Sequence, residues 1–209
     1  MFGKRLFFAF LIAPLFLVLV TWGFAQEKVP TPTPTPEPKV EYSLPYPGIL
    51  PGHPLYSIKM LRDRILRWFI TDPIKKAEYD LLMADKRLNS GLFLLEKGKT
   101  DLAETTFSKG EKYLEQALDK AEEAQKKGKD TSTLMSKLSL AVLKHQEVLS
   151  EVLQKVPEPA KKGIQNALEK SQKGIERVRE VQKKKLEQRL QERILGAKPG
   201  VSSVEAKGK

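Results

Sequence analysis

From residue 54 onward, apolar side chains recur at intervals of three and four positions, which is the period of an amphipathic α-helix. Glycine and proline interrupt the pattern and divide it into five stretches. We expect the first helix over about residues 54–70. The second is expected to start with Asp72 as its N-cap and Pro73 at its first helical position. The remaining starts are expected at Thr100 or Asp101, near Asp130 and near Ala160.

Small residues recur along one side of the second and third stretches. The second stretch alternates spacings of three and four, as a coiled-coil seam does, through Ile74, Ala77, Leu81, Ala84, Leu88, Gly91 and Leu95. The third repeats the arrangement through Ala103, Phe107, Gly110, Leu114, Ala117, Ala121 and Ala124. These seams predict helices that approach their neighbours closely.

No stretch alternates apolar and polar residues with the period of two that a β-strand shows. The connections between stretches are short, so successive helices should run antiparallel. The sequence therefore predicts an all-α domain over residues 54–196, an up-and-down antiparallel bundle of about five helices. The last helix is the longest, and we expect its C-terminal half to project beyond the bundle. Residues 197–209 are expected to form a disordered tail.

The N-terminal part of the chain differs in character from the helical part. Lys4 and Arg5 precede an apolar run over residues 6–25, which is typical of a signal peptide or a signal anchor. Removal of this segment and its retention as an anchor both stay open. Either way the basic residues favour an extracytoplasmic domain, secreted or tethered to the cytoplasmic membrane. Residues 26–53 are rich in proline and threonine, and we interpret them as a linker.

The composition gives the chain a basic net charge and excludes the chemistry of cysteine. The 37 Lys and Arg residues exceed the 26 Asp and Glu residues and give a net charge of +11. This surplus suits anionic partners, although acids are interleaved with the bases as on an ordinary solvated surface. Cysteine is absent, which excludes disulfides, cysteine nucleophiles and attachment through a lipid-modified N-terminal cysteine.

Two features of the sequence are candidates for catalysis or ligand binding. His145 has apolar neighbours at helical spacing, so we interpret it as a structural histidine, either satisfied by partners or at the rim of the core. The segment Gly98-Lys99-Thr100 is similar to the end of a phosphate-binding loop, but a helix precedes it and Phe93 replaces the required glycine. We therefore expect no nucleotide, cofactor or metal, and we assign no catalytic residue.

Two basic segments are candidate contact surfaces. The first helix combines Lys59, Arg62, Arg64 and Arg67 with an apolar stripe made of Leu55, Ile58, Leu61, Ile65 and Trp68. The C-terminal half of the last helix carries Lys183, Lys184, Lys185, Arg189 and Arg193. The first helix has the composition of one that lies on an anionic membrane. We nevertheless expect its stripe to pack into the bundle, because the four following helices need apolar partners.

Several motifs resemble a known family. They are Leu50–Lys59 (LPGHPLYSIK), Asp72–Glu78 (DPIKKAE), His145–Leu149 (HQEVL), Val156–Ala160 (VPEPA) and Ile164–Glu169 (IQNALE). Over about residues 51–175 the chain resembles the bacterial extracytoplasmic helical domain of unknown function 5667. The resemblance implies an exported or membrane-tethered bacterial protein with a helical bundle. It implies no activity and no catalytic residue.

These observations lead to three functional hypotheses. We expect a non-enzymatic, exported cell-envelope protein whose bundle is an interaction or structural module for a protein or another envelope component. The alternative is binding of a polyanion or an anionic membrane surface through the basic helices. The third hypothesis, an enzyme of unknown type, requires a polar concave site with perturbed titratable groups.

Overall fold

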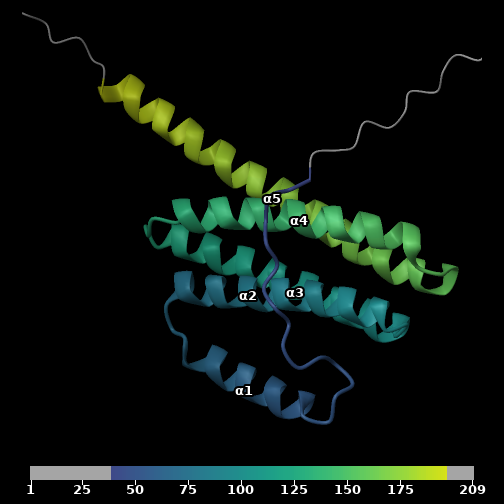
Figure 1. Cartoon of the computed structure of the whole chain (residues 1–209). Helices are drawn as coiled ribbons and strands as arrows, with labels where there is room; N and C mark the ends of the chain where they lie inside the picture. Colours follow the sequence, from purple (N-terminus) through teal and green to yellow (C-terminus); the bar gives the residue numbers. More distant parts are fainter. Residues whose placement is uncertain (1–38, 197–209) are drawn as a thin grey trace, which may run out of the picture. The chain divides into compact units, whose positions relative to one another are not determined.

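The computed structural model describes residues 39–196 of the 209-residue chain. This range contains no strand and five helices, namely α1 (Tyr56–Phe69), α2 (Pro73–Glu96), α3 (Thr100–Lys126), α4 (Ser132–Lys155) and α5 (Glu158–Gly196). Short loops join α2 to α5 in turn, and these helices run antiparallel (Figure 1). The predicted all-α bundle of about five helices is confirmed, with each predicted start within two residues of the observed one.

The start and stop signals of the sequence act as predicted. The Asp72 carboxylate accepts hydrogen bonds from the backbone N–H groups of Ile74 (2.9 Å) and Lys75 (3.1 Å) and caps α2. Gly98 and Gly128 follow α2 and α3 with φ angles of +69° and +73°. Only glycine adopts this left-handed conformation without strain, so these two residues end their helices.

The helices α2 and α3 form the most extensive pair in the bundle. Their predicted small-residue seams allow the close approach. The ring of Phe107 lies directly over Gly91, and Gly110 lies against the backbone of Ala84 and Leu88. In turn, α5 packs against both α3 and α4.

Two apolar clusters fill the bundle, with a polar layer between them. The cluster at the N-terminal half of α2 is built around Leu81, Leu114, Leu138, Val142 and Val178. The cluster at its C-terminal half is built around Leu88, Leu94, Phe107, Leu149, Val152 and Ile164. At the boundary between the two clusters, α2, α3 and α4 contribute Asp85, Glu111 and His145, all of them buried.

Residues 39–55 form an irregular segment, here called the strap, that lies against the bundle before α1 begins. The N–H of Val40 donates to Glu147 of α4 (2.7 Å), and the Asn89 side chain of α2 donates to the carbonyl of Pro45 (2.9 Å). Most of the strap belongs to the segment that the sequence predicts to be a linker. Its contacts place the start of the packed domain at about residue 39, ahead of the expected residue 54.

The structure corrects the prediction for α1. Its apolar stripe does not face the bundle, because the side chains of Leu55, Ile58, Leu61, Ile65 and Trp68 are 47–75% exposed. The side that faces the bundle is polar and includes the buried Asp63 and the ion pair of Arg67 with Asp80 of α2. The prediction was wrong because it required apolar partners there, whereas the buried Asp80 requires a cation.

The C-terminal half of α5 extends beyond the other helices, as predicted (Figure 1). Its apolar side chains Leu186, Leu190 and Ile194 are 50–73% exposed. None of the five helices between residues 39 and 196 is long and apolar enough to cross a bilayer. The predicted signal segment, residues 1–25, and the predicted tail, residues 197–209, lie outside the described residues.

Replacing Gly91 by alanine should destabilise the fold, although alanine favours helices by about 1 kcal/mol. The added methyl group would overlap the buried ring of Phe107, and overpacking of this kind costs about 1–3 kcal/mol. Urea unfolding followed by circular dichroism measures the difference.

The matched control is Gly163→Ala in α5, where the added methyl group meets only the flexible carboxylate end of Glu104. This variant should unfold within about 1 kcal/mol of the wild type. Equal stability of the two variants would contradict the packing described for α2 and α3.

Candidate functional site

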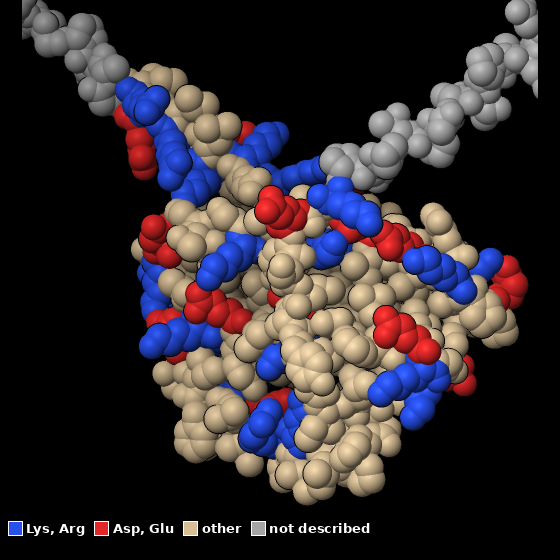
Figure 2. Space-filling view, viewed as in Figure 1, with Lys and Arg blue, Asp and Glu red and all other residues tan. Residues whose placement is uncertain are grey.

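The most prominent surface feature of the described domain is the outward face of α1. We define this face as Ile58, Leu61, Ile65, Trp68 and Phe69, which are 47–75% exposed. The rings of Trp68 and Phe69 meet edge to face, with 5.2 Å between their centroids. In the space-filling view, the bottom rim of the molecule is tan, with a group of charged atoms just above it (Figure 2).

An ion pair between Arg67 and Asp80 determines which side of α1 points outward. The Arg67 guanidinium donates to both carboxylate oxygens of Asp80, at 2.5 Å and 2.8 Å, and also to the side chain of Gln116 in α3 (3.2 Å). Asp80 is fully buried. A bidentate arrangement of this kind is the strongest geometry for an arginine–carboxylate pair. It holds the last turn of α1 against both α2 and α3.

Asp63 adds a second polar contact one turn earlier in α1. Its carboxylate accepts from Arg62 (2.6 Å), and its backbone carbonyl accepts from the Tyr79 hydroxyl of α2 (3.0 Å). Burial, followed by the negative charge of Asp63, raises the pKa of Tyr79, so the hydroxyl keeps its proton as a donor. Polar contacts therefore continue along the inner side of α1.

Arg87 of α2 is a buried cation underneath α1. Its guanidinium lies 4.2 Å from the ring centroid of Tyr113, and one nitrogen lies 3.2 Å from the Met60 sulfur of α1. Its Nε has no hydrogen-bond partner among the described residues. Stacking on an aromatic face compensates part of the charge. The layer between α1 and the bundle is thus made of long polar and aromatic side chains.

The predicted contact residues of the first helix separate into two groups. Lys59 and Arg67 point inward, and the Lys59 ammonium donates to the carbonyls of Pro47 (2.9 Å) and Ile49 (3.1 Å) in the strap. Burial, the dominant influence there, lowers the pKa of Lys59. The three remaining predicted residues, Arg62, Arg64 and Trp68, are exposed on the outer half of α1.

The structure does not bring the two predicted basic surfaces together. Lys183, Lys184, Arg189 and Arg193 are exposed on the projecting half of α5, which Figure 1 shows on the opposite side of the bundle from α1. Lys185 is partly buried instead and donates to Ser132 at the start of α4 (2.5 Å).

His145 is fully buried at the centre of the polar layer. Its Nδ1 lies 2.7 Å from Glu111 of α3, and its Nε2 lies 3.1 Å from Asp85 of α2. The Tyr42 hydroxyl of the strap donates to the other oxygen of Asp85 (2.6 Å). Burial opposes the charged imidazole, but the negative charges of Glu111 and Asp85 outweigh it and raise the pKa of His145 to about 9.

This arrangement makes His145 a structural cation at neutral pH. Both ring nitrogens are engaged, so neither is available to exchange a proton with a ligand. The prediction of a structural histidine is confirmed, and its satisfied form is the one observed. The sequence did not reveal its partners Asp85 and Glu111, because they lie on other helices, 60 and 34 residues from His145 along the chain. The signal available in the sequence was that Asp85 follows Ala84 and Glu111 follows Gly110, two residues of the apolar seams.

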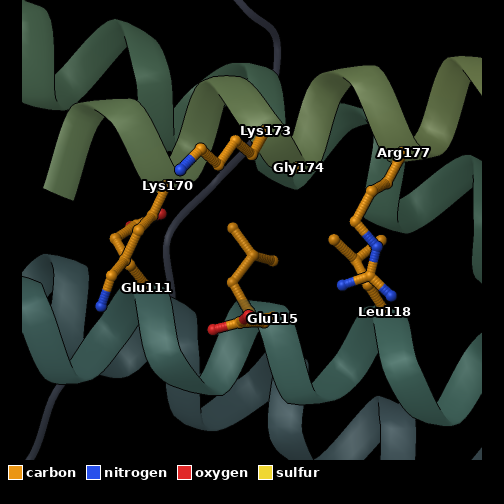
Figure 3. Close-up of a pocket in the computed structure, with 8 residues that line it drawn as sticks. Glu111, Glu115, Leu118, Lys170, Lys173, Gly174 and Arg177 are labelled. Carbon is orange, nitrogen blue, oxygen red and sulfur yellow. The ribbon is translucent and has the colours of Figure 1, made fainter. Parts of the chain in front are cut away.

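A shallow hollow lies between α3 and α5 next to this layer. It measures about 360 Å³, part of it open to solvent, and Leu118 and Gly174 are among the residues that line it (Figure 3). Lys170 reaches from α5 down beside Glu111, whose Oε2 has no hydrogen-bond partner among the described residues. Between residues 39 and 196, no group of three or more His, Asp and Glu side chains is placed to hold a metal ion.

The pKa of His145 predicts a loss of stability at alkaline pH. The folded value of about 9 lies above the usual 6.5, so the stabilisation is complete below pH 6.5 and is lost as the pH rises through 9. We expect the free energy of unfolding to fall by on the order of 3 kcal/mol across this window. Urea unfolding between pH 6 and pH 9.5 measures the change.

The control is His145→Gln, which keeps hydrogen-bonding capacity but cannot carry the charge. It should be several kcal/mol less stable at pH 6, because two buried carboxylates lose their cation. It should also lose the alkaline decline. Parallel pH profiles for the two proteins would show that His145 is not the titrating group.

Comparison with known proteins bears on the family of the chain. No curated protein and no solved structure matches it. Residues 48–159 match the family described as a domain of unknown function, DUF5667. The match runs from the strap to the start of α5 and ends before the resembling segment Ile164–Glu169. As the sequence motifs indicated, the chain belongs to the DUF5667 family.

Proposed function

We propose that this chain is an exported cell-envelope protein without enzymatic activity, and that its helical bundle is an interaction module. In this proposal the bundle is a platform and the outward face of α1 is the contact surface. The observation that carries the proposal is the orientation of α1, which turns its apolar residues to solvent and its polar residues to the bundle.

Contiguous exposed apolar surface supports a contact role. Single exposed apolar residues are ordinary on protein surfaces, but a continuous patch of large ones marks an interaction site. Here Trp68 and Phe69 are 75% and 68% exposed, and they continue the line of Ile58, Leu61 and Ile65 along one helix. Aromatic side chains of this kind supply much of the binding free energy at interfaces.

The way in which α1 is held supports the same role. The contacts of Arg67 with Asp80 and of Tyr79 with Asp63 leave α1 helical and its inner side satisfied before any partner arrives. The backbone of a preformed helix has little conformational entropy left to lose on binding. The buried titratable groups, including His145, hold helices to one another, which supports a structural role for them.

Export is supported by the sequence. The apolar run over residues 6–25 follows two basic residues and precedes a proline-rich segment, as in secreted or tethered envelope proteins. The absence of cysteine leaves apolar burial and ion pairs to stabilise the domain.

A second candidate function is polyanion binding through α5. The exposed Lys183, Lys184, Arg189 and Arg193 lie on a helix that projects from the bundle. Glu187, which lies 3.9 Å from Lys183, offsets part of this charge. The candidate predicts that the chain retards duplex DNA at low salt, with binding that falls steeply as salt rises. Fluorescence anisotropy with the charge-reversed variant Arg189→Glu/Arg193→Glu tests it, and equal affinity of the two proteins rejects it.

The main proposal makes a prediction for intact cells. In bacteria that express the full chain, protease added to cells stripped of their wall should digest the helical domain and spare a cytoplasmic marker protein. A photocrosslinking amino acid at Ile65 should form adducts with envelope material, because this position lies in the middle of the outward face of α1.

The control position for crosslinking is Leu140 of α4, which is also apolar and 45% exposed but lies on another helix of the bundle. It should give few adducts. Protection of the domain from external protease would contradict export. Similar yields from Ile65 and Leu140 would contradict the contact role of α1.

A further inference from the structure

We infer that the outward face of α1 docks on the surface of an anionic lipid bilayer, with the helix axis in the plane of the interface. This inference rests on the proposed function and names the partner of the same surface. Binding of an anionic membrane surface is an alternative that the sequence itself suggests, and the observed orientation of α1 provides its physical basis.

The residues of the outward face have the arrangement that an interfacial helix needs. Successive residues of a helix are rotated by about 100°, which places Arg62 and Arg64 on opposite sides of the apolar face. Both arginines are exposed. Long basic side chains beside an apolar face can extend to lipid headgroups while the apolar residues enter the acyl region. Trp68 suits the boundary between these two regions.

The charge of the exposed part of α1 has one sign. Asp63 is the acidic residue of α1, and its carboxylate is buried and bound by Arg62. The outer half of the helix therefore presents Arg64 without an acidic partner from α1 itself, while Arg62 is exposed but shares its charge with Asp63. An anionic surface is attracted to such a helix, and each basic residue near it strengthens the attraction.

The same charge argues against a second copy of this chain as the partner. If two copies met through their outward faces about a two-fold axis, the arginines at positions 62 and 64 of one copy would lie near those of the other. Like charges in such an interface repel one another. An anionic lipid surface removes this repulsion and replaces it with attraction.

The shape of the face also favours lipid over a folded protein. The outward residues lie along one side of a single helix, whereas hollows of the described surface lie along the strap, between α3 and α5, beside the start of α4 and at both ends of α5. A protein partner must offer a groove that fits this side of the helix. A bilayer is fluid and adapts to a convex apolar helix without a matching shape.

The polar side of α1 explains how the helix can lie at an interface as part of a bundle. Interfacial helices normally turn their polar side to water. In this chain the bundle takes the place of water, because Asp80, Tyr79 and Gln116 supply partners for the inner side of α1. The bundle therefore lies on the aqueous side when the apolar face enters the lipid.

The predicted N-terminal segment places the domain near such a surface. Residues 26–38 separate the apolar run from the first described residue, Lys39. Even fully extended, these residues span at most about 47 Å. Where the apolar run is retained as an anchor, α1 is held at a high effective concentration beside the bilayer, and a weak helix–lipid contact is sufficient.

The test uses the full chain with Trp22→Phe, which leaves Trp68 as its single tryptophan. The protein is reconstituted in vesicles that contain brominated phosphatidylcholine, with and without phosphatidylglycerol. We expect Trp68 emission to shift to shorter wavelength and to be quenched by the bromines, more strongly with phosphatidylglycerol and less strongly at high salt.

Two variants of this protein make the test specific. Ile65→Asp introduces a charge into the outward face and should shift the docking equilibrium of α1 toward the undocked state by about tenfold or more, read as the loss of Trp68 quenching in the reconstituted protein. Leu140→Asp introduces the same charge at an exposed apolar position on α4 and should leave quenching unchanged. Circular dichroism verifies that both variants are folded.

Three outcomes overturn the inference: Trp68 emission that stays at the wavelength of water-exposed tryptophan, quenching that is equal in Ile65→Asp and Leu140→Asp, and shielding of Trp68 in a lipid-free dimer. If any of these is found while Ile65 still crosslinks to an envelope protein in cells, the proposed function stands with a different partner. If crosslinking also fails, the contact role of α1 fails with it.

Discussion

Two buried carboxylates of α2 constrain much of this fold. Asp80 is fully buried and Asp85 is 4% exposed, and an unpaired charge at either position costs about 3–5 kcal/mol. Arg67 of α1 pairs with Asp80, while His145 of α4 pairs with Asp85 from the other side of α2. A single helix thereby determines how elements on both of its sides are oriented.

The ion pair of Asp80 with Arg67 orients α1 opposite to the way that burial of its apolar residues would orient it. Full burial of a large apolar side chain contributes about 1.5–3 kcal/mol, so the outward residues Ile58, Leu61 and Ile65 together outweigh one ion pair. The fold nevertheless keeps them in water, because the fully buried Asp80 binds Arg67 on the opposite side of α1. The outward face of α1 is consequently the place where this domain has most apolar surface left to bury.

Much of the architecture could be predicted from local signals. Asp72, Gly98 and Gly128 act within one turn of the chain, so the helix boundaries are readable from the sequence. Periodicity identified the stripe of α1 but not its direction, because a pattern shows which residues share a face and not where that face points. The partners of His145 were inaccessible for a related reason, since they lie on other helices.

The strap determines where a pulling force from the N-terminal side of the chain enters the bundle. The described chain begins at Lys39, and the bonds of Val40 with Glu147 and of Tyr42 with Asp85 come ahead of every contact of α1. Tension applied from the N-terminal side is therefore transmitted first to Glu147 of α4 and Asp85 of α2, and α1 carries none of it while these bonds last. In a tethered form of the chain, a pull from the N-terminal side would therefore load the contacts of the strap before those of α1.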